Sequence, residues 1–234
     1  PTDIAFVPGR PDLMIVLART TPYEDVVKKT DGMSVFLVDL RDAAGITIRS
    51  IQTMMNHNTT EVFFDDVHVP ADALVGVEGM GFRHILDGMN AERILIASEC
   101  IGDGRFFLDR AVEYAGTRHV FDRPIGANQG VQFPLARAYA SLSAADLMRK
   151  KAAALFDGGR PCGTEANTAK FLASEASWAA ANACMDTHGG FGFAVEYDVE
   201  RKFRETRLYQ VAPIANNLVL AYLGQHVLGL PRRY

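Results

Sequence analysis

Short apolar runs in the first third of the chain alternate with turn-forming residues. The runs MIVLA (14–18), SVFLVDL (34–40), ITIRSI (46–51) and TEVFFDDVHV (60–69) are rich in β-branched and aromatic residues. Pro, Gly, Asp and Asn separate them, as is typical of strands bounded by turns. This pattern predicts strands of a predominantly antiparallel sheet.

The period of the apolar positions changes near residue 75. Beyond that point, apolar residues recur with helical spacing over about 80–118, 129–157, 164–188 and 207–229. The pattern therefore predicts a helical bundle, and we expect one domain over 1–75 and a second over 76–234.

The third helical segment carries an unusual row of small side chains at alternating steps of three and four. Such a seam lets a neighbouring helix approach closely, which predicts a central helix. Gly158, Gly159 and Pro161 are expected to separate it from the preceding helix, and Gly189 with Gly190 to end it. The seam consists of Ala166, Ala169, Ala173, Ala176, Ala180, Ala183 and Thr187.

Composition and charge exclude several classes of partner. Of the 234 residues 48% are hydrophobic, which is enough for a sizeable core, and 24 basic against 28 acidic residues give a formal charge of −4. No basic block is present, so neither nucleic acid nor an anionic membrane surface is an expected partner. No apolar run reaches the roughly 18 residues that a membrane-spanning helix needs.

The cysteines and histidines do not suggest a metal site. Cys100, Cys162 and Cys184 are odd in number and far apart, without a CxxC pair. Six histidines show no ligand spacing, and no Ser-His-Asp order stands out. We therefore expect a reducing, cytoplasmic location and no metal-dependent chemistry.

Four motifs in order resemble the acyl-CoA dehydrogenase family along essentially the whole chain. They are FFDDVHVP, GVEGMGFRHILDGMNAER, TRHVFDRPIGANQGVQFPLA and MDTHGGFGFAVEYDVERKFRETRLYQ. The resemblance implies an α+β fold in which residues 1–75 form the second half of a middle β-domain and 76–234 an up-down four-helix bundle. It also implies that the family's N-terminal helical domain is absent from this chain, and a start at Pro1 without an initiator Met is consistent with a fragment.

The motif TRHVFDRPI carries the first candidates for cofactor binding. A guanidinium near a helix end can clamp a pyrophosphate, although such an Arg can equally serve as a partner of the helix dipole. The resemblance implies that Arg118 and Phe121 contact the FAD of a neighbouring subunit and that Gln129 lies beside them. Asp122 stands where the family usually has Gly, which puts a negative charge near that contact.

The HGGFGF stretch provides the second group of candidates. Its glycines can end a helix, or they can let a phosphate or adenine approach the backbone. The resemblance implies that residues 186–190, among them Asp186, Gly189 and Gly190, approach the adenosine half of the cofactor across the subunit interface. Asp186 replaces the usual Gln, so an acceptor-only carboxylate stands in place of an amide.

Acyl-CoA dehydrogenation needs a carboxylate that removes the α-proton. Many family members carry this Glu in the pattern YQ-x-x-EG-T, which places Pro213 at the base position here, and proline cannot accept a proton. The resemblance to the isovaleryl-CoA and long-chain enzymes, which carry the base on an earlier helix just before an Arg, points instead to Glu92 in NAERILIA. Asn90 and Arg93 are then the substrate-binding candidates, with Arg93 orienting the carboxylate or the CoA. The alternative is that Glu92, just after Asn90, only stabilises the opening turn of a helix.

The segment after Pro213 also departs from the family. Ile214, Ala215, Asn216 and Asn217 stand where Gly, Thr, Ser and Gln are usual. Pro213 is acceptable in the first turn of a last helix. A helix start with the Asn amides pointing outward and a contact with the cofactor both remain open.

The resemblance implies an oxidoreductase of fatty acid metabolism that carries out FAD-dependent α,β-dehydrogenation of an acyl-CoA. It implies a homotetramer or a heteromer, with electron-transfer flavoprotein or a similar acceptor as the redox partner. Two alternatives stay open. One is a non-catalytic partner subunit of a heteromeric dehydrogenase, which the losses at 213–217 favour. The other is an acyl-CoA oxidase or flavin monooxygenase on the same fold.

Overall fold

The computed structural model describes residues 13–41, 44–55 and 59–231, so the first twelve residues of the predicted β-domain lie outside the described residues. The chain divides into two compact units, residues 1–89 and 90–234. The division falls inside a helix rather than at residue 75, because the first turn of that helix packs on the sheet of the first unit. A Cβ added to Gly81 would lie only 2.6 Å from the backbone carbonyl carbon of Ser34.

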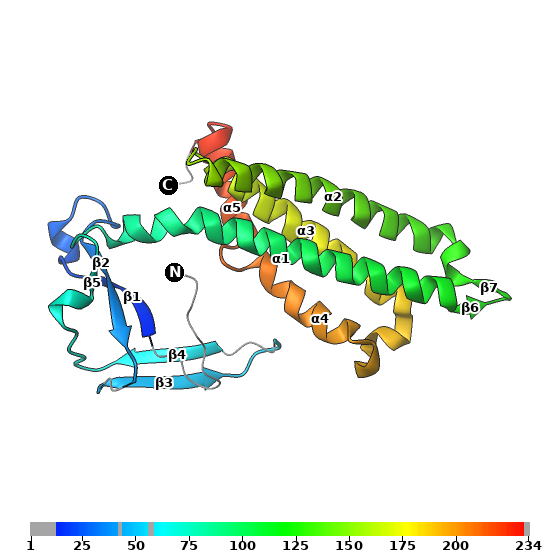
Figure 1. The fold of residues 1–234 in the computed structure, drawn as a ribbon, viewed down its shortest axis with the longest axis horizontal. Helices are drawn as coiled ribbons and strands as arrows, with labels where there is room; N and C mark the ends of the chain where they lie inside the picture. The colour runs from blue at the N-terminus through cyan, green and yellow to red at the C-terminus, as the bar shows by residue number, and fades with distance from the viewer. Residues whose placement is uncertain (1–12, 42–43, 56–58, 232–234) are drawn as a thin grey trace. The chain divides into compact units, whose positions relative to one another are not determined.

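The first unit is antiparallel, as the sequence predicts. Strand β1 (Leu13–Arg19) pairs with β2 (Met33–Asp39), and β5 (Leu74–Val75) pairs with the other edge of β2. Strands β3 (Ile46–Ile51) and β4 (Thr59–Phe64) form a separate two-stranded ladder. Figure 1 shows both ladders at the blue and cyan end of the colour bar.

One strand boundary differs from the expectation. Strand β4 ends at Phe64 and not at residue 69, because the chain turns at Asp66, whose φ of 48° is incompatible with an extended strand. Val35, Val38 and Leu40 form the buried apolar centre of this unit.

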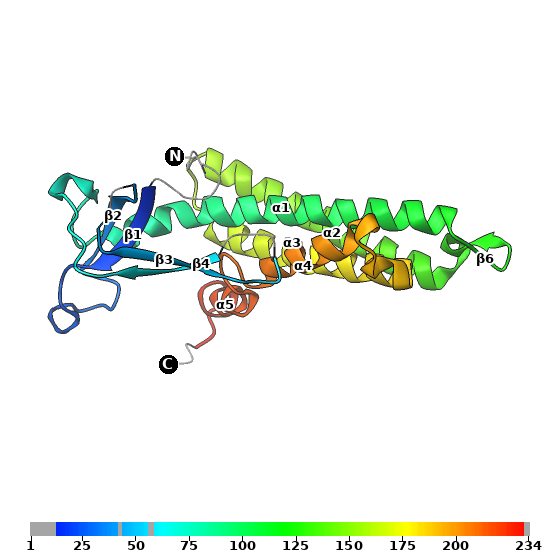
Figure 2. The same cartoon turned by 90° about the horizontal axis from the view of Figure 1, so that it is seen from below.

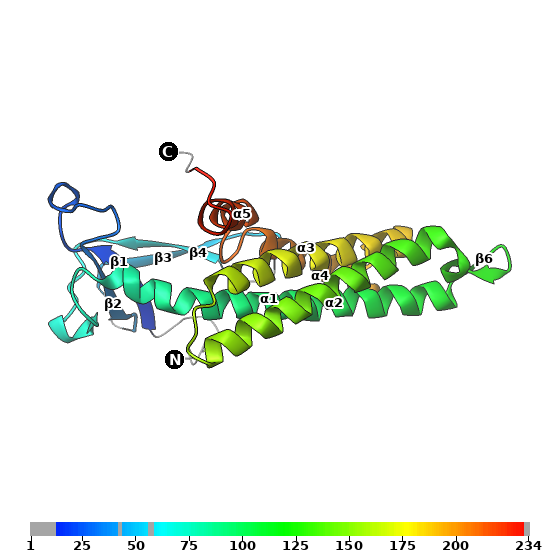
Figure 3. The ribbon, with the colours of Figure 1, turned by 90° about the horizontal axis from the view of Figure 1, so that it is seen from above.

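The helical unit is built around three long helices (Figures 1 and 3). Helix α1 spans Gly81–Thr117, α2 spans Gln129–Asp157 and α3 spans Gly163–His188. A two-residue hairpin of β6 (His119–Val120) and β7 (Arg123–Pro124) projects between α1 and α2, which Figure 2 shows beyond the ends of the helices. The first three predicted helices are thus confirmed.

The fourth predicted helix, over 207–229, is wrong in its bounds. The chain runs back along the bundle as α4 (Val199–Thr206) and one 3-10 turn, η6 (Arg207–Gln210). It then leaves helical geometry around Pro213 and resumes as α5 (Asn216–Tyr222). Pro213 lacks an N–H and disfavours helical dihedrals in the residue before it, so the helix cannot continue through this position. Pro213 is therefore in a turn and not in the first turn of a helix.

The remaining elements are single turns that connect the longer ones. Five are 3-10 turns and the last is a π turn: η1 (Tyr23–Asp25), η2 (Ala71–Ala73), η3 (Ile125–Ala127), η4 (Gly189–Phe193), η5 (Val195–Tyr197) and η7 (Leu223–Val227). Across the residues that the structure describes, no helix has the length and apolar character needed to cross a bilayer.

The seam on α3 is buried throughout, which confirms the central position of this helix. Each of its seven small residues, from Ala166 to Thr187, is at most 9% exposed. Side chains from α1 and α2 fill the space around it, among them Ile101, Leu108 and Leu142.

A second buried row on α3 was not anticipated. It runs beside the first with the same alternation and is largely polar: Asn167, Lys170, Ser174, Ser177, Ala181, Cys184 and His188. Buried polar groups of this kind need partners on neighbouring elements. From this row Lys170 reaches the turn before α5, and His188 stacks on Tyr114 of α1.

Candidate cofactor and catalytic sites

A cavity of about 640 Å³ lies where the end of α1, the β6–β7 hairpin and the end of α3 meet. Its lining includes four of the residues assigned to the cofactor from the sequence: Arg118, Asp186, Gly189 and Gly190. We call it the Arg118 cavity. Residues separated by about seventy positions in the sequence are therefore brought to one site by the packing of α1 against α3.

The local backbone leaves this cavity open. Helix α3 ends at Gly189, whose φ of 56° is a left-handed conformation that favours glycine. A Cβ built on Gly189 or Gly190 would meet no atom within 4 Å, so a ligand can approach this stretch of backbone closely.

The guanidinium of Arg118 remains available in this position. Among the described residues it has no carboxylate within salt-bridge distance, and its one ring contact is with Phe191, 5.9 Å from the ring centroid. By contrast, Arg123 donates a hydrogen bond of 2.9 Å to the side-chain oxygen of Asn128. The guanidinium of Arg118 can therefore bind a phosphate in this cavity. If Arg118 served only as a partner of the helix dipole, it would not need to face a cavity.

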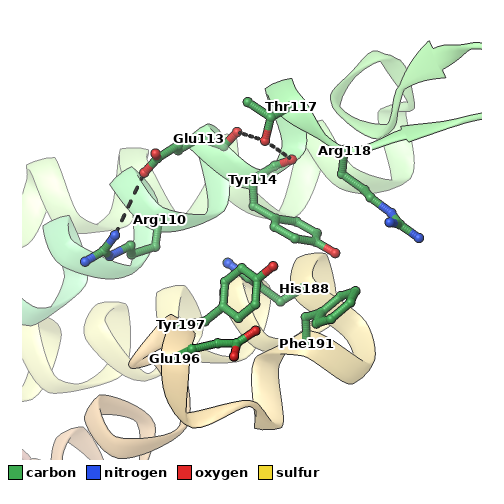
Figure 4. A pocket seen from close by; sticks show the side chains of 9 residues that line it. All are labelled: Arg110, Glu113, Tyr114, Thr117, Arg118, His188, Phe191, Glu196 and Tyr197. Carbon is green, nitrogen blue, oxygen red and sulfur yellow. Dashed lines mark hydrogen bonds and ion pairs between the residues drawn. The ribbon is translucent and has the colours of Figure 1, made fainter.

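An aromatic cluster braces the wall of this cavity, and sequence analysis missed it. The ring of His188 stacks on Tyr114 with centroids 4.3 Å apart, and Tyr197 meets both rings edge-on. Figure 4 shows the cluster from the side of a second cavity of about 480 Å³, which shares Tyr114, Arg118, His188 and Phe191 with the first. The sequence signal for this cluster is the presence of Tyr114, His188 and Tyr197 close to the cofactor motifs.

His188 is buried and its orientation is fixed. Its Nδ1 lies 2.9 Å from the backbone carbonyl oxygen of Cys184, and because that oxygen can only accept, Nδ1 carries a proton and donates it there. The imidazole is thereby held flat against Tyr114, and its position sets the exit direction of the chain into Gly189.

Phe121 and Gln129 do not line the Arg118 cavity. Phe121 is 94% exposed at the tip of the hairpin, where Phe121 and Asp122 both adopt positive φ. Asp is among the residues that tolerate this conformation, which explains how Asp122 fits where Gly is usual. Gln129 is exposed at the first residue of α2. Both side chains are therefore exposed outside that cavity.

Glu92 lies deeper in a helix than the sequence suggested. Helix α1 begins at Gly81, so Glu92 lies about three turns into it, and the alternative of an N-terminal capping role is contradicted. Glu92 is exposed and makes no hydrogen bond or ion pair among the described residues. Its carboxylate is therefore open to a substrate.

The two substrate-binding candidates lie beside it and contact each other. Arg93 Nη1 donates a hydrogen bond of 3.1 Å to Asn90 Oδ1, whereas the buried Arg93 Nε has no partner. Burial lowers the pKa of Arg93, and the negative charge of Glu92 partly offsets this shift. Arg93 is consequently a half-buried cation with an unused donor.

A polar network links α3 to the turn before α5, and sequence analysis also missed this feature. The fully buried Lys170 donates hydrogen bonds of 2.7 Å to Ile214 O and to Asn216 Oδ1. The Asn216 amide nitrogen lies 3.0 Å from Ser174 Oγ and donates to Gln210 Oε1, also at 3.0 Å. The Asn216 amide is thus turned inward, so the expectation of an outward-pointing amide is wrong at this position.

The titration of Lys170 should be visible in the stability of the protein. Burial lowers its pKa from the ordinary 10.5 to about 8, with Cys100 and Glu175 acting in the opposite direction and Arg93 in the same one. Between these two values the unfolded chain binds more protons than the folded one, so the free energy of unfolding rises with pH in this window. The penalty of the buried charge is fully present below about pH 8.

We expect the free energy of unfolding of the wild type to rise relative to that of Lys170→Met as pH increases from about 8 to 10.5. The expected change is on the order of 3 kcal/mol. Denaturant unfolding at several pH values measures it. A pH-independent difference would show that Lys170 is not buried as a cation.

Two further buried contacts fasten α4 to the bundle. Lys202 Nζ pairs with Asp103 Oδ1 at 2.7 Å, and the Ser177 and Thr206 hydroxyls lie 2.7 Å apart. Burial raises the pKa of Asp103, and the bond to Lys202 counteracts this shift. These contacts hold the return pass of the chain in place and do not reach the Arg118 cavity.

Comparisons with known proteins agree with this architecture. A family model described as the acyl-CoA dehydrogenase C-terminal domain matches residues 79–216. The chain is 46% identical over 176 residues to acyl-CoA dehydrogenase fadE12 of Mycobacterium bovis, covering 74% of this chain and 45% of that protein. It is 35% identical over 224 residues to an acyl-CoA dehydrogenase of Bacillus subtilis, covering 94% of this chain and 58% of the relative.

A solved structure shows the same fold. The glutaryl-coenzyme A dehydrogenase complex with glutaryl-CoA superposes with a TM-score of 0.89 at 30% identity, covering 95% of this chain and 56% of that chain. Fold and matches together define a class of α+β proteins whose C-terminal part is an up-down four-helix bundle. The chain belongs to the acyl-CoA dehydrogenase family. It spans about half the length of the curated relatives it matches.

Proposed function

We propose that the intact protein is an FAD-dependent acyl-CoA dehydrogenase in which Glu92 is the catalytic base. The observation that carries the proposal is the open carboxylate of Glu92 on α1, next to the half-buried Arg93, in a chain whose usual base position is Pro213. The relative crystallised with glutaryl-CoA supports a CoA thioester as the class of substrate.

The proposed reaction balances without a further reactant. The α C–H bond breaks and its proton passes to the Glu92 carboxylate, while the electron pair left behind forms the α,β double bond. The β-hydrogen leaves as hydride, for which bound FAD supplies the acceptor. Arg93 fixes the orientation of Glu92 or of the CoA through its remaining N–H donors.

The residues of the Arg118 cavity fit part of such a cofactor. A phosphate needs a cation and accessible backbone, and both are offered by Arg118 and the unobstructed Gly189–Gly190 stretch. Asp186 in the same lining offers only acceptors, so it suits a hydroxyl or amino group and disfavours a phosphate next to it.

The proposal extends to assembly and redox partners. Phe121, fully outside the fold at the hairpin tip, supports a flavin site completed across subunits of a homotetramer or heteromer. Electron-transfer flavoprotein or a similar acceptor is the proposed oxidant of the reduced protein. Acyl-CoA dehydrogenation of a fatty acid or a branched-chain acid is the proposed metabolic setting.

Anaerobic addition of acyl-CoA to the intact, FAD-loaded protein is expected to bleach the flavin absorbance, and an electron-accepting dye is expected to restore it. The bleaching follows from two-electron reduction by the substrate. Peroxide formation in air at a comparable rate would favour an oxidase instead. No bleaching by acyl-CoAs of any chain length, with FAD fully bound, would favour a non-catalytic partner subunit.

A further inference from the structure

The turn between η6 and α5, residues 211–215, has little backbone support of its own. Pro213 has no N–H, and neither Pro213 nor Ile214 takes part in a backbone–backbone hydrogen bond with any described residue. The turn is anchored by backbone bonds only at its ends, where Ala212 N donates to Leu208 O at 2.9 Å and Leu218 N donates to Ala215 O at 2.9 Å.

Lys170 supplies the missing support. Its ammonium reaches from α3 to Ile214 O in the middle of the turn and to Asn216 at its end, both at 2.7 Å. Ser174 and Gln210 hold the Asn216 side chain from two further sides. The turn is therefore fixed by side chains that converge on one buried cation.

Burying a lysine at this position costs free energy, because its ammonium loses its hydration. Its side chain is 0% exposed, and no carboxylate of the described residues lies within salt-bridge distance of the ammonium. Burying an ion without a bonded counter-ion costs several kcal/mol. An apolar or small residue would match the rest of the α3 interface. Such a residue could not donate the hydrogen bonds that hold the turn.

The turn lies near the helical segment that carries the proposed base. Tyr209, two residues before the turn, hydrogen-bonds Glu99 on α1, two helical turns along from Glu92. The Arg93 guanidinium on the same helix also acts on the charge of Lys170 on α3. The same end of the bundle brings the Tyr222 hydroxyl to 3.0 Å from a Cβ built on Gly163. Helix α5 packs on α3 at this end of the bundle.

We propose that Lys170 is a positioning residue for the acyl-CoA site: through Ile214 O and Asn216 it holds the 211–215 turn as a fixed wall of that site. The inference rests on the proposed function, because it assigns the wall to the substrate of that reaction. A displacement of about 1 Å in the groups that orient a substrate can lower a rate by about 100-fold.

The test compares Lys170→Met with Lys202→Met in the intact, FAD-loaded protein. Both changes remove a lysine that packs inside the bundle, but Lys202 bonds Asp103 and does not touch the turn. At equal FAD content, Lys170→Met is expected to slow flavin reduction by about 10- to 100-fold and to raise the apparent KM for acyl-CoA. Lys202→Met is expected to retain both values in its folded fraction.

Hydrogen exchange provides a readout that does not depend on activity. Amides of residues 208–218 are expected to exchange at least about tenfold faster in Lys170→Met than in the wild type, since the turn loses its central anchor. Asn216→Ala serves as the second variant if Lys170→Met does not fold, and the same exchange change is expected in milder form. It removes the amide but leaves the bond from Lys170 to Ile214 O.

Unchanged exchange in the turn, or equal kinetic losses in the Lys170 and Lys202 variants, would overturn the inference. If the wild type itself fails to reduce its flavin, the proposed function fails, and the exchange experiment alone decides whether Lys170 positions the turn. If the wild type is active and Lys170→Met keeps its rate and KM, only the inference about Lys170 fails.

Discussion

Glu92→Gln is expected to slow flavin reduction by acyl-CoA by about 10² to 10⁴-fold, the contribution of a general base. Glutamine keeps the shape and hydrogen-bonding capacity of the side chain but cannot accept a proton at neutral pH. FAD content and acyl-CoA binding are expected to remain close to the wild-type values, because Glu92 is exposed and bonds no other described residue. Stopped-flow absorbance at the flavin band measures the rate.

Glu99→Gln is the matched control for this variant. Glu99 is also exposed and lies two helical turns further along α1, where its hydrogen bond with Tyr209 contributes to a raised pKa of that phenol. Its replacement is expected to leave flavin reduction near the wild-type rate. A loss confined to Glu99→Gln would move the base from position 92 to position 99.

Phe107→Ala is expected to lower the free energy of unfolding by about 3–5 kcal/mol, the usual loss for a large aromatic side chain in a packed core. Phe107 is 0% exposed and packs edge-on against Phe106, with centroids 5.5 Å apart. Phe107 belongs to the buried cluster that α1, α2 and α3 share, so its truncation leaves a cavity in the packed core. Denaturant unfolding followed by circular dichroism measures the change.

Phe133→Ala on α2 provides the comparison within the same bundle. Phe133 is 58% exposed, so its truncation is expected to change the unfolding free energy by no more than about 0.5 kcal/mol. Similar losses in the two variants would contradict the description of the core.

The regular elements could be predicted because the spacing of apolar and small residues along the chain reveals strands and helices directly. The small-residue seam from Ala166 to Thr187 on α3 identified the most buried helix without any knowledge of its neighbours. By contrast, α4 has the sequence VERKFRET, which is short and highly charged, so only Val199 and Phe203 mark its apolar face. Its helical geometry depends on tertiary contacts such as Lys202 with Asp103.

The candidate site was predictable only where motifs carry it. Arg118, Asp186 and Gly189 were named from motifs, and the structure brings them to one cavity. Lys170 was not, because lysines are almost always exposed and nothing next to it in the sequence shows that Ile214 and Asn216 lie opposite. A contact across more than forty residues is a property of the packed bundle, which a single sequence does not display.

The depth of Glu92 in α1 was misjudged for a related reason. Asn90 two residues earlier is typical of a helix start, whereas in the structure its side chain accepts a hydrogen bond from Arg93 inside a continuous helix. The structure thus contradicts the capping alternative, and the role of Glu92 as the base stays a prediction.

The most direct test of the account is one anaerobic turnover of the intact, FAD-loaded protein, comparing wild type, Glu92→Gln and Glu99→Gln after rapid mixing with an acyl-CoA that the wild type oxidises. We expect the flavin band to bleach at comparable rates in the wild type and Glu99→Gln. In Glu92→Gln we expect it to persist while the acyl-CoA still binds. Bleaching of Glu92→Gln at the wild-type rate would contradict the assignment of Glu92 as the base.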